Sequence, residues 1–174
     1  MHAKYLPIVL ILAMPAILRA QFQIVHFETL EGYLPNGDYE AYQRGKPTGE
    51  TSSMMGFATS WAQVRYVSSG DSTKGTISVK ITDMLNLPSY ISMMGDVDKK
   101  SETGYERTVF YNGLKILESY DSVSHQGKLQ FQVANRFLIE ITGSGISGTQ
   151  PLYGLLDRTN ISGLVKLVQS RNGH

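Results

Sequence analysis

The 174-residue chain contains no cysteine. This absence excludes disulfide bonds, thiolate catalysis and metal sites built on cysteine sulfur. Histidine is scarce too, with four in the whole chain, and no two of them have the HxxxH spacing of a metal-binding helix. We therefore expect no metal site, and the stability of the fold must come from its hydrophobic core.

Neither sign of charge dominates. Sixteen lysine and arginine residues stand against fifteen aspartate and glutamate residues, for a formal net charge of +1. The sequence also has no basic run. A protein that binds nucleic acid needs a basic patch or stripe to neutralise phosphates. The composition therefore argues against a nucleic-acid partner.

The common catalytic motifs are missing as well. No serine lies in a GxSxG or SxxK pattern. The segment 143–148 has the glycine density of a phosphate-binding loop but lacks the Lys-Ser/Thr ending. The close acid pairs Glu28/Glu31 and Asp96/Asp98 are typical of a solvated surface. These absences favour a protein that is not an enzyme and carries no cofactor.

Long hydrophobic runs are also absent, except at the start of the chain. Residues 6–18 are apolar, follow a short basic end and precede a possible cleavage site after Ala20, as in a secretory signal peptide. An uncleaved membrane anchor is the alternative, but the run is shorter than the roughly 20 residues of a spanning helix. We predict a signal peptide over residues 1–20, a periplasmic or secreted location, and membrane contact only through that segment if it stays uncleaved.

The clearest pattern that is present predicts a β-hairpin. The runs 105–111 and 114–120 are rich in aromatic and β-branched residues and flank Asn112-Gly113, the dipeptide best suited to a two-residue type I′ turn. The turn fixes the register. It places Tyr111 opposite Leu114, Val109 opposite Ile116, Arg107 opposite Glu118 and Tyr105 opposite Tyr120, and every pair is chemically compatible.

Residues 128–142 alternate with period two. Leu129, Phe131, Val133, Phe137, Ile139 and Ile141 fall on odd positions, whereas polar residues occupy most even ones, which predicts a sheet with one buried face. Fifteen extended residues would span about 50 Å, too long for one strand of a small domain. We expect a turn near Asn135, with a three-residue loop 134–136 because that loop keeps the apolar side chains on one face. A single long, bent strand is the alternative.

The remaining segments complete an α+β pattern. Strands are expected at 49–54, 60–67 and 76–83, a polar connection at 96–103, and helices near 24–32, after Pro88, around 152–156 and after a capping Asn160. Residues 21–174 are therefore predicted to form a single α+β domain. It has an antiparallel β-sheet of about six or seven strands, with helices packed on one face.

Aromatic side chains with polar tips suggest a binding surface. Tyrosine is abundant, and such residues suit ligand or partner surfaces as well as ordinary β-sheets. The proposed surface lies on the open face of the sheet and comprises Trp61, Tyr66, Tyr105, Tyr111, Tyr120 and Arg136. The leading hypothesis is an exported, non-enzymatic domain that binds a protein partner or a small ligand at the sheet or at the loop 143–148.

Two alternative functions remain open. The first is a hydrolase or lyase that uses an aspartate or glutamate with His26 or His125. The second is a copper-binding protein, because Met54-Met55 and Met93-Met94 form adjacent thioether pairs with Met84 between them in sequence. Methionine as adaptable core filler is the simpler interpretation of these pairs.

Several stretches resemble a known group of domains. The runs VFYNGLKILESYD (109–121) and LQFQVANRFLIEITGSGIS (129–147), with Ser60-Trp61-Ala62 and VKITDM (79–84), resemble small exported bacterial α+β domains of unknown function. The layout is also loosely similar to the PsbP-like α/β sandwich, whose members mostly act as accessory or binding modules. The resemblance implies an α+β fold and a binding role, and it carries no established activity to this chain.

Overall fold

The computed structural model describes residues 23–54, 57–69, 75–85 and 95–172. These residues form nine strands and three helices. In chain order the elements are α2 (Phe27–Glu31), β1 (Tyr42–Arg44), β2 (Thr48–Met54), β3 (Phe57–Ser68), β4 (Thr76–Asp83), β5 (Asp98–Lys100), β6 (Gly104–Tyr111), β7 (Leu114–Asp121), β8 (Gln126–Val133), β9 (Phe137–Ser144), α4 (Gln150–Arg158) and α5 (Ile161–Asn172).

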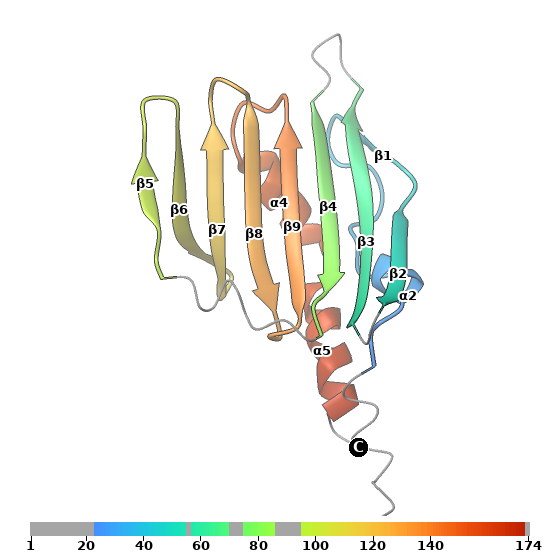
Figure 1. The fold of residues 1–174 in the computed structure, drawn as a ribbon. Helices are drawn as coiled ribbons and strands as arrows, with labels where there is room; N and C mark the ends of the chain where they lie inside the picture. The colour runs from blue at the N-terminus through green and yellow to red at the C-terminus, as the bar shows by residue number, and fades with distance from the viewer. Residues whose placement is uncertain (1–22, 55–56, 70–74, 86–94, 173–174) are drawn as a thin grey trace, which may run out of the picture.

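All nine strands belong to one antiparallel sheet. The strand order is β1-β3-β4-β9-β8-β7-β6-β5, and β2 also pairs with β3. The strands from β6 to β9 follow one another as a meander, whereas β4 lies next to β9. Figure 1 shows the sheet from its open face, with the helices behind it. This arrangement fits the predicted α+β class.

The prediction of six or seven strands is wrong, because two further strands exist. These are β1 and β5, each three residues long. The first lies before the expected strand 49–54, where no strand was predicted, and the second lies in the expected connection 96–103. Three residues are too few to show a period of two, and the Asp-Lys-Lys composition of β5 hid it among polar residues.

The predicted hairpin is confirmed with its register. Tyr111 pairs with Leu114, Val109 with Ile116, Arg107 with Glu118 and Tyr105 with Tyr120. Asn112 and Gly113 have φ angles of 49° and 78°, as the turn requires.

The odd-numbered loop is also confirmed. β8 and β9 pair with Val133 opposite Phe137, so the loop is 134–136. Ala134 and Asn135 both have positive φ. The six odd-numbered apolar residues of these strands are all buried in the core: Leu129, Phe131, Val133, Phe137, Ile139 and Ile141.

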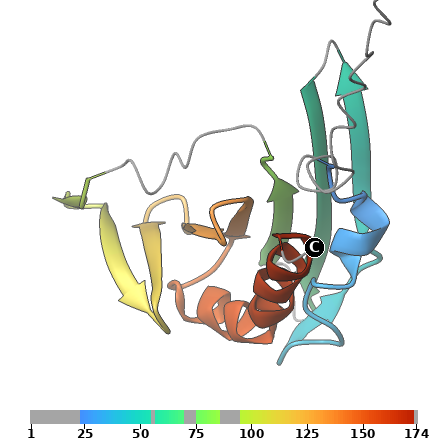
Figure 2. The same ribbon diagram turned by 90° about the horizontal axis from the view of Figure 1, so that it is seen from below.

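The core lies between the sheet and the helices on one face. Figure 2 shows α4 and α5 on the same side of the sheet, and α4 lies against β8 and β9 while α2 lies against β2 and β3. Leu152, Leu155 and Leu156 of α4 are buried there, as the sequence predicted. Asn160 caps α5 as expected, since its Oδ1 accepts a hydrogen bond from the Gly163 amide at 2.9 Å.

A pair of facing glycines brings α4 close to the sheet. Gly127 of β8 pairs with Gly143 of β9. A Cβ on Gly143 would lie 2.5 Å from Ile146 Cδ1 and 3.0 Å from Leu152 Cδ2. The missing side chains therefore make the space that Ile146 and Leu152 fill.

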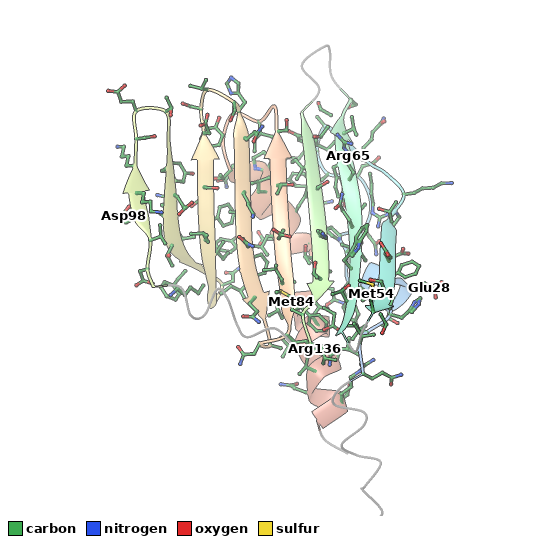
Figure 3. The ribbon with its side chains drawn as sticks, viewed as in Figure 1. Glu28, Met54, Arg65, Met84, Asp98 and Arg136 are labelled. Carbon is green, nitrogen blue, oxygen red and sulfur yellow. The ribbon has the colours of Figure 1, made fainter. Side chains whose placement is uncertain are left out.

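A buried ion pair fixes the lower end of the sheet. The Arg136 guanidinium donates from Nε to Asp83 Oδ1 at 2.9 Å and from one terminal nitrogen to Asp83 Oδ2 at 2.7 Å. It also donates to the Gln23 carbonyl, and the Val25 amide donates to Asp83. The pair thus joins β4, the β8–β9 loop and the segment before α2. Arg136 lies at this end of the sheet (Figure 3).

Two predicted segments lie outside the described residues. They are the signal peptide over 1–20 and the helix after Pro88. Within the described ranges, no helix is long and apolar enough to span a membrane.

Candidate functional site

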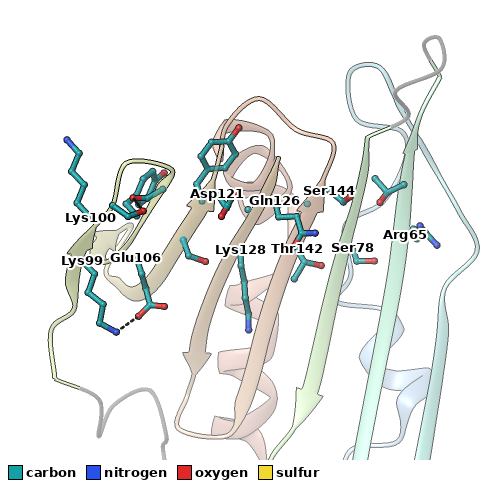
Figure 4. A pocket seen from close by; sticks show the side chains of 18 residues that line it. Arg65, Ser78, Lys99, Lys100, Glu106, Asp121, Gln126, Lys128, Thr142 and Ser144 are labelled. Carbon is teal, nitrogen blue, oxygen red and sulfur yellow. Dashed lines mark hydrogen bonds and ion pairs between the residues drawn. The ribbon is translucent and has the colours of Figure 1, made fainter. Parts of the chain in front are cut away.

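The open face of the sheet carries a concavity of about 730 Å³ near the upper ends of the strands. The core residues of each strand point toward the helices, so alternate side chains point away from them and form this face. The lining comes from β3, β4, β9, β8, β7, β6 and β5 and consists of charged and polar residues with three glycines and two tyrosines. Figure 4 shows its charged and hydroxyl side chains on the side of the sheet away from the helices.

The floor of the concavity is a row of directly paired residues. Each member is the cross-strand partner of the next, from β3 at one side to β5 at the other. The polar row, as we call it, consists of Arg65, Ser78, Thr142, Lys128, Ser119, Glu106 and Lys99. Six strand spacings of about 4.8 Å make it about 29 Å long. The sheet register therefore fixes the order and spacing of these groups.

The carboxylates around the row already have partners. Glu106 Oε1 lies 3.2 Å from Lys99 Nζ, and Glu140 Oε1 lies 3.2 Å from Lys128 Nζ. Asp121 Oδ1 accepts hydrogen bonds from two backbone amides, Val123 at 2.9 Å and Ser124 at 2.8 Å. The Ser124 amide and hydroxyl are the main reason that the pKa of Asp121 lies below its ordinary value.

One cation of the polar row has no such partner. Among the described residues, the side chain of Arg65 has no hydrogen bond or ion pair, and it is exposed on β3. Lys100 of β5 also has no side-chain partner there, but it pairs with Tyr105 and therefore points to the helix side of the sheet. The side chains of Thr142, Ser144 and Gln126 are likewise without protein partners in the part of the chain that is described. The concavity thus offers donors that the protein itself does not use.

The structure separates the aromatic residues that the sequence grouped on one open face. Tyr66 was predicted there beside Trp61, but it is completely buried and donates to the Pro35 carbonyl at 3.0 Å. The two residues are five apart on one strand, and an odd separation places side chains on opposite faces. Trp61 does lie on the open face, with Lys80 Nζ 5.0 Å from its ring centre, but it does not line the concavity.

Tyr105, Tyr111 and Tyr120 do share a face, but it is the face that the helices cover. Tyr120 donates to the Ile146 carbonyl at 3.0 Å, and Tyr111 donates to Asp157 of α4 at 2.9 Å. These tyrosines hold the helical layer to the sheet. Arg136, the sixth predicted residue, is 8% exposed and is engaged by Asp83, so its charge is not offered to a partner.

The sequence patterns did not reveal Arg65, Ser78 and Lys99. A signal existed for part of the site, because the even-numbered polar residues of 128–142 were assigned to the wetter face, and Lys128 and Thr142 belong to it. The same alternation in 76–83 would have added Ser78. Arg65 required the pairing of β3 with β4, and Lys99 required the unrecognised strand β5.

A second polar cluster lies under α4. Glu118 is 1% exposed and its Oε1 accepts from the Tyr105 hydroxyl at 2.8 Å and the Thr149 hydroxyl at 2.6 Å, while Oε2 accepts from Arg107 Nε at 3.0 Å. Burial alone would raise the pKa of Glu118, but these hydrogen bonds outweigh it and the pKa lies below its ordinary value. Burial and then the nearby Glu118 carboxylate raise the pKa of Tyr153. The cluster ties β6 and β7 to α4.

A smaller groove of about 580 Å³ lies between the hairpin turn and the α4–α5 junction. Its carboxylate, Asp157, accepts from both the Tyr111 hydroxyl and the Asn112 amide. Its guanidinium, Arg158, donates to the Asp38 carbonyl at 2.8 Å. Both charged groups of this groove are therefore already engaged.

The groups behind the alternative functions lie elsewhere. His26 Nδ1 is 3.7 Å from Glu28 Oε2, and both side chains are more than half exposed. His125 has a positive φ in the β7–β8 turn. In the described ranges, no three histidine or acidic side chains come together as a metal site. Met54 and Met84 lie on different segments (Figure 3), and Met55, Met93 and Met94 lie outside the described residues.

Comparisons with known proteins do not assign the chain to a family. No family model matches the chain, and neither the curated proteins nor the solved structures include a match. The resemblance to small exported bacterial domains and to the PsbP-like sandwich therefore stays a prediction.

Proposed function

We propose that the protein is an exported binding module that holds its ligand in the concavity on the open face of the sheet. One observation carries the proposal. Seven strands present polar side chains into a concavity of about 730 Å³ while the helices cover only the other face. This volume lies within the roughly 300–1,000 Å³ of typical ligand sites.

The electrostatics of the concavity support binding rather than proton transfer. A general acid or base needs a titratable group free to exchange its proton with a substrate. The carboxylates beside the polar row instead pair with lysines or cap backbone amides. The groups that remain free are one guanidinium, hydroxyls and an amide, which suit recognition by hydrogen bonds and charge.

A blocking substitution tests the proposal. Thr142 is exposed at the middle of the polar row, and tryptophan is well accepted in strands. Thr142→Trp should fill the concavity and leave the fold intact. Thr48→Trp makes the same change at an exposed position of β2 outside the concavity, so it is the matched control.

Binding is measured by calorimetry against a fixed panel: polygalacturonate, neutral dextran, a polyglutamate peptide, a polylysine peptide and single-stranded DNA. We expect the wild type and Thr48→Trp to bind at least one member, and Thr142→Trp to lose that binding. Mass spectrometry should recover the probe unchanged. Equal binding by both variants, a cleaved probe, or no binding to any member would contradict the proposal.

A further inference from the structure

From the free edge of β2, we infer that the chain forms a two-fold symmetric dimer in which β2 pairs antiparallel with β2 of a second copy. Such a dimer leaves the concavity open, because no residue of β2 lines it. Three features of β2 carry the inference: its unpaired backbone groups, the lack of residues that protect an edge, and side chains that match a second copy of the same strand.

The backbone groups on the outer side of β2 have no partner in the described ranges. β2 pairs there only with β3, and Figure 1 shows it as the outermost strand at the lower right of the sheet. The Arg65 carbonyl accepts from the Gly45 amide, so the odd-numbered residues of β3 direct their backbone groups toward this edge. Their partners in β2 are even-numbered, which leaves the N–H and C=O groups of Gly49, Thr51 and Ser53 facing outward.

The two edges of the sheet differ in protection. Natural sheets block an exposed edge with a short strand, lysine or proline, because unpaired backbone groups recruit other strands. At one edge, β5 is three residues long and two of them are lysine. At the other edge, β2 has seven residues and contains neither lysine nor proline. The strand that can receive another strand is therefore β2.

A two-fold axis through Thr51 uses the outward groups of both copies. It sets Thr51 opposite Thr51 of the second copy and Gly49 opposite Ser53 of the second copy. Each of these pairs exchanges two N–H···O bonds in an antiparallel ladder. Every other register leaves at least one of the three outward residues outside the pairing of the two β2 strands.

The side chains of β2 agree with this register. Its one charged residue, Glu50, lies opposite Ser52 of the second copy and not opposite another charge. Met54 lies opposite Thr48 of the second copy, and its side chain is 75% exposed, more than any other large apolar side chain in the described ranges. Side chains are close in these non-hydrogen-bonded pairs, so the dimer covers Met54.

These features favour a second copy over a strand of another protein, because the pairing needs only residues of this chain. The contact uses the same surface of both subunits and closes after two copies. The axis is perpendicular to the sheet, so the helices of both copies lie on one side and both concavities open on the other. One strand pair is smaller than a standard protein interface, so the dimer is weak and depends on concentration.

Sedimentation velocity over about 1–100 µM protein, the range of weak complexes, measures the dimer. We expect the dimer fraction of the wild type to rise over this range. Ser53→Pro should abolish the dimer because it removes an outward amide, and it should fold because proline is tolerated where an edge N–H faces solvent. Ser53→Ala keeps this amide and is the matched control, with a dissociation constant within about twofold of the wild type.

Ser52→Lys and Ser52→Glu test the register. Ser52 of each copy lies opposite Glu50 of the other, so lysine creates two cross-strand ion pairs and glutamate creates two repulsive pairs. We expect the dissociation constant to fall about threefold for lysine and to rise about threefold for glutamate, with smaller changes at high salt. Both variants keep every backbone amide, so they decide the question even if Ser53→Pro fails to fold.

Three results would overturn the inference: a monomer at every concentration, a dimer that folded Ser53→Pro retains, or changes of the same sign in the two Ser52 variants. A monomer whose β2 edge binds an extended peptide would overturn the second copy as the occupant. None of these results bears on Thr142→Trp, so the proposed binding site stands or falls separately.

Discussion

At the scale of single residues, the two buried charged clusters stabilise the fold. Asp83 and Arg136 join three segments at one end of the sheet, and Glu118 joins β6 and β7 to the start of α4. Removing one partner of a buried charged network leaves the others unsatisfied, which costs more than the loss of an exposed pair. The charged residues most important for stability are therefore different from those in the concavity.

Glu118→Gln tests this division. We expect a loss of about 2–4 kcal/mol in the free energy of unfolding, because the amide cannot accept the Tyr105, Thr149 and Arg107 hydrogen bonds together. Glu106→Gln, in an exposed ion pair, should change the free energy by at most about 1 kcal/mol. Urea unfolding at pH 7 measures both, and equal losses would contradict the assignment.

The stability of Glu118→Gln should also depend on pH differently from that of the wild type. The pKa of Glu118 is lowered in the folded protein, so its stabilisation is fully present above the unfolded value of about 4.3. It is lost as the pH falls through the lower, folded pKa. The free energy of unfolding of the wild type should therefore fall more steeply than that of Glu118→Gln below about pH 4.5. Parallel curves would mean that Glu118 is not held ionised by its neighbours.

Residue chemistry alone did not reveal these roles. Tyr66 was assigned to a binding surface because aromatic residues with polar tips suit such surfaces, and Arg136 was placed with it, but both are buried. The partner of Arg136, Asp83, is 53 positions away in sequence and its own pattern gives no sign of it. Arg107 and Glu118, by contrast, were paired correctly because a two-residue turn fixes their register.

At the scale of elements, the period of two and the turn residues determined most of the sheet. The hairpin at Asn112-Gly113 and the loop 134–136 follow from the alternation and from turn geometry. The strands β1 and β5 could not be found in this way, because three residues show no period and their pairing depends on neighbours far along the chain. Lys99, at one end of the polar row, was not predicted for the same reason.

The packing of α4 against the sheet depends on the facing glycines, Gly127 and Gly143. Gly143→Val should destabilise the protein by about 1–3 kcal/mol, because Ile146 and Leu152 already fill the space beside Gly143 and overpacking forces them to move. Thermal unfolding measures the effect. Thr142→Val, one position away on the exposed face, is the control, and an equal shift in the two variants would contradict the packing account.

At the scale of the whole molecule, the two faces of the sheet have different roles. The apolar face, the glycine pair and the tyrosines hold the helices. The open face carries the polar row, whose spacing is set by the register of seven strands. A rigid sheet can present a row of polar groups without ordering a loop on binding, which lowers the entropic cost of association.

The most direct measurement of this account is the map of backbone amide shifts on adding the panel member that binds most tightly to the ¹⁵N-labelled protein. We predict that the largest shifts follow the polar row, at Ser78, Thr142 and Ser119, and that the amides of α4 and α5 stay unchanged. Shifts that gather instead at the groove beside Asp157, or a spectrum that does not change at all, would contradict the claim that the open face is the binding surface.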